Sequence, residues 1–224
     1  MRLAGTDFTL VNNQITGTSN YGISCGISGT PTSAANLKIW HNSIFIAHPA
    51  AGSQYCSLRW YSNATGTEVV DNICVDTYPS LTTSVYNMWC SGSYRPALMD
   101  FNCLWSNQPG YFPVAASGNR TFAQWQGLGF DLHSIAADPA FVAPTAPTPD
   151  LHLQAGSPCS TAGTTLVTVP GDFFFAPRTP PVSMGAHEED SGAVYAVFGA
   201  GCVGSAGVPS NTASPALQIG GTAT

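Results

Sequence analysis

Charged residues are scarce in this sequence. Asp, Glu, Lys and Arg make up 8% of its 224 residues, against about 25% in an average domain, and Lys38 is the only lysine. The 12 acidic residues outnumber the 6 basic ones, giving a formal net charge of −6. Nucleic-acid binding needs clustered Lys and Arg, so we expect no nucleic-acid partner. With 44% apolar residues, the chain is nevertheless apolar enough to fold.

Several other features are missing as well. The chain has no unbroken run of about 20 apolar residues, so we predict no membrane span. It has no Cys-x-x-Cys pair, no Cys/His cluster with zinc spacing, and no P-loop, GxSxG or HExxH motif. Long amphipathic segments of Leu, Ala, Glu and Lys are also missing, which excludes the helical repeat classes. Instead, 23 Gly and 17 Pro indicate a turn-rich β protein.

A spaced pattern recurs through the first half of the chain. It consists of an apolar residue, two variable residues, an Asn, one variable residue and a second apolar residue. The copies are Leu10–Asn13–Ile15, Ile39–Asn42–Ile44, Val69–Asn72–Cys74 and, with Phe in place of Asn, Leu98–Phe101–Cys103. The residues at the Asn position are 29, 30 and 29 apart, which is typical of a solenoid with stacked coils.

The stretches around these positions have the alternation of short strands, separated by Gly, Pro, Ser and Asn. We therefore predict an all-β fold, a right-handed parallel β-helix with coils about 4.8 Å apart. Residues 1–120 would form the coils of an array that begins upstream. Residues 121–190 would form the last coil and a closing segment that covers the open final edge. Residues 191–224 would begin a further C-terminal module.

The Asn positions have a physical explanation in such a fold. Asn tolerates the left-handed backbone conformation that a sharp turn between strands requires. Its side-chain amide can also hydrogen-bond to the same amide one coil above and one coil below. We therefore predict an internal ladder of Asn13, Asn42 and Asn72.

The chain has seven cysteines, which favours an oxidising compartment; buried thiols acting as small apolar side chains are the alternative. Cys74 and Cys103 occupy the same place in successive repeats. Their Cα atoms would lie about 4.8 Å apart, within the window of about 4.4–6.8 Å for a disulfide. The sequence thus allows a Cys74–Cys103 disulfide, and two stacked thiols would look the same.

Stacking also turns polar columns of the sequence into spatial neighbours. Lys38 and Glu68 fall in one column, and His41, Asp71 and Asp100 fall in the next polar column. These five are the candidate catalytic residues of an acid/base site. An elimination reaction would need a base to remove the proton next to a carboxylate of the substrate and a cation to offset the charge that develops. Asp71 and Asp100 could hold that cation as calcium, and no other cofactor is indicated. The alternative is a surface salt bridge and a hydrogen-bonded turn.

Four aromatic residues are candidates for stacking against sugar rings. They are Trp40, Trp60, Tyr61 and Trp105. Trp40 follows Ile39, which we expect to face inward, so alternation points Trp40 outward. The alternative for each ring is packing beneath a loop.

The second half of the chain resembles the closing segment of secreted bacterial right-handed parallel β-helix proteins, a group that includes polysaccharide lyases. The stretches that carry the resemblance are 121–126, 129–134, 137–141, 150–158, 171–173, Arg178 and 184–188. The resemblance implies a short capping helix near 122–127 and secretion or display at the cell surface. Thr161 and Ser183 depart from it, because that group usually has Asp there. The uncharged stretch 195–220 resembles the start of a Gly/Cys-marked module of exported surface proteins.

These observations favour an exported β-helix module that contacts extracellular polysaccharide as a monomer. The first alternative is a polysaccharide lyase or glycoside hydrolase that acts on acidic polysaccharide through the five candidate residues. The second alternative is a purely structural stalk or adhesin.

Overall fold

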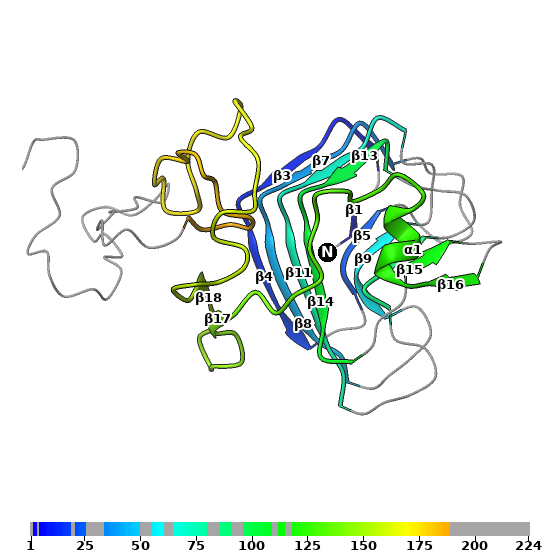
Figure 1. The fold of residues 1–224 in the computed structure, drawn as a ribbon, viewed down its shortest axis with the longest axis horizontal. Helices are drawn as coiled ribbons and strands as arrows, with labels where there is room; N and C mark the ends of the chain where they lie inside the picture. The colour runs from blue at the N-terminus through cyan, green and yellow to red at the C-terminus, as the bar shows by residue number, and fades with distance from the viewer. Residues whose placement is uncertain are drawn as a thin grey trace, which may run out of the picture.

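Short parallel strands stacked coil upon coil form the body of the protein. The computed structural model describes residues 2–3, 5–18, 21–25, 34–49, 55–60, 65–79, 86–90, 96–108, 112–114 and 118–188. Three parallel sheets surround a common interior (Figure 1), and each successive coil adds one strand to each of them. The chain is therefore a parallel β-helix, as the repeat period predicts.

Each of the three sheets holds four strands in the order of the coils. Sheet one consists of β3 (Thr9–Val11), β7 (Lys38–Trp40), β10 (Glu68–Val70) and β13 (Leu98–Asp100). Sheet two consists of β4 (Gln14–Thr18), β8 (Ser43–Ala47), β11 (Ile73–Thr77) and β14 (Cys103–Ser106). Sheet three consists of β1 (Arg2–Leu3), β5 (Tyr21–Cys25), β9 (Cys56–Trp60) and β12 (Met88–Cys90).

The remaining elements are short. They are the parallel pair β2 (Gly5–Thr6) and β6 (Ala34–Ala35), the antiparallel pairs β15 (Phe112–Val114) with β16 (Gly118–Arg120) and β17 (Phe141–Ala143) with β18 (Asp150–Leu153), and helix α1 (Phe122–Gln126). No helix in the described part of the chain is long and apolar enough to cross a membrane.

A ladder of buried amides runs through the turn between sheets one and two. The Nδ2 group of Asn13 donates to Asn42 Oδ1 at 2.9 Å, and Asn42 Nδ2 donates to Asn72 Oδ1 at 2.9 Å. The ladder continues from Asn72 to Asn102 at 3.1 Å and from Asn102 to the carboxylate of Asp131 at 3.0 Å. The predicted ladder is thus confirmed, and it is two members longer than the sequence pattern indicated.

The additional Asn of the ladder, Asn102, shifts the fourth repeat of the sequence pattern by one residue. Val69 pairs with Met99 and Cys74 pairs with Leu104, so Asn102, and not Phe101, lies opposite Asn72. The series Met99–Asn102–Leu104 follows the same apolar–Asn–apolar spacing as the other copies.

The left-handed turn residues also lie one position before the ladder. Asn12, His41, Asp71 and Phe101 have φ values of 54°, 51°, 57° and 55°. The expectation that the ladder Asn residues themselves take this conformation was wrong. The ladder amides are fixed by backbone carbonyls instead, since each Nδ2 also donates to the carbonyl two residues earlier, as Asn72 Nδ2 does to Val70 O at 3.1 Å.

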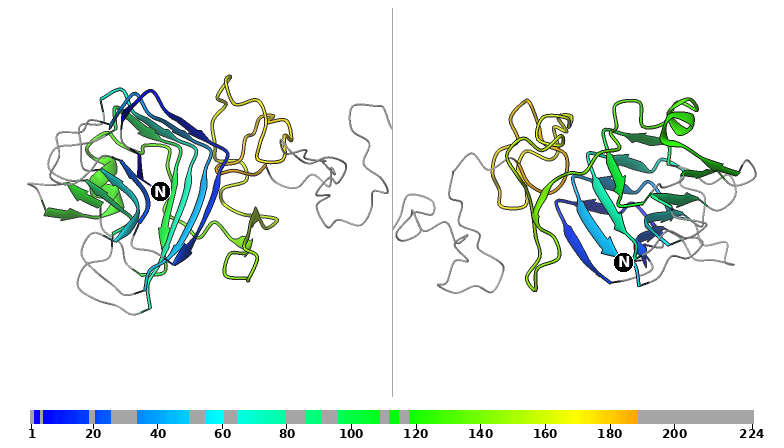
Figure 2. Two further views of the ribbon diagram at one scale, coloured as in Figure 1. Left: turned by 180° about the vertical axis from the view of Figure 1, so that it is seen from behind. Right: turned by 60° about the horizontal axis from the view of Figure 1, so that its bottom comes forward.

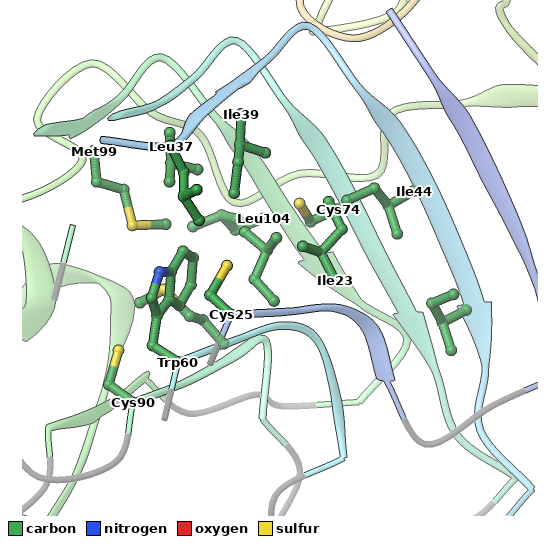
Figure 3. Close-up of a cluster of buried hydrophobic side chains, with 14 of the residues drawn as sticks. Ile23, Cys25, Leu37, Ile39, Ile44, Trp60, Cys74, Cys90, Met99 and Leu104 are labelled. Carbon is green, nitrogen blue, oxygen red and sulfur yellow. The ribbon is translucent and has the colours of Figure 1, made fainter. Parts of the chain in front are cut away.

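The inner core fills the space between the three sheets. It holds the inward side chains of alternate strand residues, among them Ile39, Ile44, Trp60 and Cys74 (Figure 3). Helix α1 closes the end of this core after the last coil, where Trp125 is fully buried and stacks on Phe130.

Helix α1 begins with a capping box. The Gln124 backbone N–H donates to the Thr121 hydroxyl, and the Thr121 N–H donates to the Gln124 side chain. The predicted capping helix is therefore confirmed, one residue shorter than the range 122–127.

A second core lies on the outer face of sheet two. The covering segment, residues 135–188, runs back beside this sheet toward the first coil, on the side opposite α1 (Figure 2). The outward side chains Phe45, Ile73 and Val75 pack there against Leu151 and Met184. The segment after α1 thus covers a side of the solenoid, whereas the sequence led us to expect a lid over its final edge.

The ladder should control stability most strongly at its centre. Asn72→Ala leaves the buried backbone N–H of Asn42 without its acceptor and removes several amide bonds, so we expect a loss of about 2–4 kcal/mol in unfolding free energy. Asn13→Ala is the matched control, because Asn13 is only partly buried and water can replace its bonds. Urea unfolding of both variants measures the difference, and equal losses would contradict the prediction.

Candidate functional site

The outer face of sheet one carries the polar columns that the sequence singled out. Lys38, Glu68 and Leu98 lie in one column, and their register is set by the pairing of β7 with β10 and of β10 with β13. The next outward column holds Trp40, Val70 and Asp100, while Ile39, Val69 and Met99 face the inner core.

Lys38 and Glu68 form an ion pair on adjacent coils. Their side chains are 32% and 29% exposed, and the Lys38 ammonium lies 5.2 Å from the centre of the Trp40 ring. A partly exposed pair of this kind contributes about 0–1 kcal/mol to stability. The indole and two opposite charges therefore form one continuous patch on the outer face of sheet one.

Asp100 is bound to His133, which is not among the candidate catalytic residues. The carboxylate accepts the backbone N–H of His133 at 2.7 Å and lies 2.7 Å from its ring Nδ1. The His133 side chain is 63% exposed and stacks on Phe101 with 4.8 Å between ring centres. His133 follows the last coil in the chain, so only the fold reveals that it sits at the end of the Trp40 column.

His41 and Asp71 lie beneath the covering segment and are fully buried. Their Nε2 and Oδ2 atoms are 3.4 Å apart, and the Thr164 N–H donates to Asp71 Oδ1 at 2.8 Å. Gly163 is required here, because a Cβ atom would come within 2.9 Å of that oxygen. No substrate can reach this pair while the covering segment is in place.

Burial governs the charge of both groups. It raises the pKa of Asp71 to about 8 and, together with the Arg178 charge, lowers the pKa of His41 to about 3. Both groups are therefore neutral between about pH 3 and about pH 8.

Arg178 ties the covering segment to the first coil. Its guanidinium pairs with Glu188, donates to Asn12 Oδ1 at 2.9 Å and donates to the Gly185 carbonyl at 2.9 Å. The Asn12 amide in turn donates to the Gly171 carbonyl at 2.7 Å. These bonds hold the covering segment over the turns that contain His41 and Asp71.

The five candidate catalytic residues therefore do not form one site. Lys38 and Glu68 lie on the accessible face, Asp100 is engaged by His133, and His41 and Asp71 are enclosed. The predicted calcium pair of Asp71 and Asp100 is also split, because Asp71 lies in the turn while Asp100 pairs with Val70 in sheet one. Among the residues that the structure describes, no group of three or more metal-binding side chains occurs.

The aromatic candidates separate in the same way. Trp40 is half-buried on sheet one, and Trp105 is half-buried at the margin of the outer core. Trp60 is fully buried in the inner core, so the prediction that it stacks on sugars was wrong. Tyr61 lies outside the described residues.

The Cys74–Cys103 disulfide that the sequence allowed is not formed. Cys103 pairs with Ile73 and not with Cys74, and both cysteines are free thiols. Successive residues of a strand face opposite sides, so Cys74 enters the inner core (Figure 3) and Cys103 enters the outer core.

A buried polar cluster escaped the sequence analysis. Asp76 lies 2.7 Å from His48 Nε2 and accepts the Ser57 hydroxyl at 2.8 Å, and His48 stacks on Tyr78. Burial raises the pKa of Asp76 to about 6. The carboxylate sits between the Ser and the His, so the His cannot activate the Ser as in a catalytic triad. The sequence holds one sign of this cluster: His48 and Tyr78 are 30 residues apart, which is one repeat period, so they lie on adjacent coils.

The comparisons with known proteins return no relatives. No protein-family profile, curated protein or solved structure matches this chain. The resemblance to polysaccharide lyases and to a C-terminal surface module therefore stays a prediction.

The neutral state of Asp71 has a measurable consequence. Its pKa is about 8 in the fold and near the ordinary value of 3.8 in the unfolded chain, so the folded state retains a proton between these values. Its contribution to stability is complete below pH 4 and is lost as the pH rises toward 8. The Asn side chain of Asp71→Asn cannot ionise, so this variant does not lose that stability. The difference in unfolding free energy, variant minus wild type, should therefore increase with pH by at most about 1.4 kcal/mol per pH unit across this range.

Urea unfolding at pH 4, 6 and 8 measures this gain. The control is Asp7→Asn, at an exposed turn residue with the same left-handed conformation. A constant difference between Asp71→Asn and the wild type at the three pH values would contradict a buried, protonated Asp71.

Proposed function

We propose that this chain is an exported or cell-surface β-helix module that contacts extracellular polysaccharide through the outer face of sheet one. The observation that carries the proposal is the half-buried Trp40 ring beside the Lys38–Glu68 pair. The Asp100–His133 pair extends the same face by one further coil.

The chemistry of this face suits sugars. An indole ring offers an apolar surface for the C–H face of a sugar ring, and flanking charged groups hydrogen-bond to its hydroxyls. Trp40, Glu68 and Asp100 belong to three successive coils spaced about 4.8 Å apart, so an extended polymer could contact several coils at once. Lys38 would favour a polymer that carries carboxylates.

Support for export comes from the composition and from the resemblance of residues 121–188. The chain is low in charge and relatively rich in cysteine, which suits an oxidising compartment.

A polysaccharide lyase is the second candidate, and it rests on His133. An exposed imidazole held by a carboxylate at Nδ1 leaves Nε2 as the nitrogen that could remove a proton. With His41 and Asp71 enclosed, an enzyme at this face would use the Asp100–His133 pair in their place. Release of unsaturated uronate products, followed by ultraviolet absorbance, would support it, and loss of that activity in His133→Gln would identify the base.

Binding to immobilised polygalacturonate and alginate, with a neutral glucan for comparison, tests the lead proposal. Trp40→Ala should weaken binding about two- to tenfold, because a stacked ring contributes roughly 0.5–1.5 kcal/mol. Phe175→Ala is the matched control, since Phe175 is a 69% exposed aromatic on the covering segment. Equal losses in both variants, or no binding by the wild type, would reject the proposal, and the latter would favour a structural stalk.

A further inference from the structure

Two cysteines meet in the outer core from distant parts of the sequence. Cys103 is the first residue of β14, and Cys159 belongs to the covering segment, 56 residues later. Both are fully buried and both belong to the cluster that joins sheet two to the covering segment. The Cys159 thiol is a direct neighbour of the Cys103 thiol.

The backbone around each thiol is held in place. The Cys103 thiol also donates to the Ala137 carbonyl at 3.1 Å, and Cys103 forms a parallel bridge with Ile135. On the other side, the Met184 N–H donates to the Cys159 carbonyl at 2.9 Å. The Cys159 N–H donates to the Ser157 hydroxyl at 3.1 Å. Both cysteines are therefore held by fixed segments within the same outer core.

The inner core offers no comparable pair among the cysteines that the structure places in register. Cys25 and Cys90 both lie opposite Trp60, on either side of it, so they are two coils apart. Two coils correspond to about 9.6 Å, which exceeds the span of a disulfide. Cys74 lies between Ile44 and Leu104.

We propose that Cys103 and Cys159, which are free thiols in this structure, form a disulfide on oxidation that fixes the covering segment to the last coil. The bond forms by exchange with a small-molecule disulfide such as oxidised glutathione. One cysteine thiolate attacks the glutathione disulfide and releases one glutathione thiolate, and the second cysteine then displaces the other. The two cysteines lose two protons and two electrons, and the products are one protein disulfide and two glutathione thiols.

The timing of this reaction follows from burial. Contact with the Cys159 thiol and burial raise the pKa of Cys103, so the attacking thiolate is scarce once the outer core has packed. The disulfide therefore forms while the covering segment is still open. The reduced native protein should react slowly, and mild denaturant should accelerate its oxidation.

Peptide mapping of the full chain tests the proposal without any variant. The reduced, unfolded protein is refolded in a glutathione redox buffer, blocked with N-ethylmaleimide and cleaved before Asp residues. Cleavage places Cys103 in peptide 100–130 and Cys159 in peptide 150–171, each as the only cysteine. A linked pair of these two peptides is expected. Recovery of both as separate alkylated peptides, or of either linked to another cysteine, would overturn the proposal.

Stability provides a second measurement. A disulfide that closes a loop of this length lowers the unfolding equilibrium constant on the order of a thousandfold in the chain-entropy model. This difference between oxidised and reduced protein should disappear in Cys103→Ala and Cys159→Ala and should persist in the control Cys74→Ala. If a variant does not fold, the peptide map of the wild type still decides the question.

Discussion

The amide ladder between sheets one and two is the constraint on which the rest of the structure depends. Each Asn donates its side-chain N–H to the next coil, and each after Asn13 accepts from the previous one, so the donors along the ladder point toward the end of the solenoid. The last amide of such a chain needs an acceptor beyond it. Asp131 meets this need, since it accepts the Asn102 amide, the Ser134 hydroxyl and the Trp125 indole N–H.

This ending couples the ladder to the cap. The Trp125 indole closes the inner core and, through Asp131, is bonded to the last amide. Burial raises the pKa of Asp131, while the three accepted hydrogen bonds oppose that rise. Helix α1 is only five residues long, so its place is fixed by these tertiary contacts more than by its own helical stability.

The covering segment explains why the polar columns of the sequence do not form one site. It packs its apolar side chains on sheet two, and its Arg178 network carries it over the turns that hold His41 and Asp71. Sheet one keeps an accessible outer face with Trp40, the Lys38–Glu68 pair and Asp100. The same covering segment therefore removes one candidate site and defines the boundary of another.

The sequence by itself determined the architecture, because the 29- to 30-residue period and the buried Asn positions are compatible with few folds. It could not fix the register of the fourth coil, since Leu98 and Met99 both fit the apolar position, and a slip of one residue moves every side chain to the other face. That slip misplaced Cys103.

The face of the solenoid that the covering segment packs on is determined by tertiary contacts. Its apolar residues match the outward side chains of sheet two, which come from several different coils, and no local pattern records that match. The same packing determined that His41 and Asp71 are enclosed and that His133 reaches Asp100. Accessibility depends on contacts between distant segments, and these exist only in the folded chain.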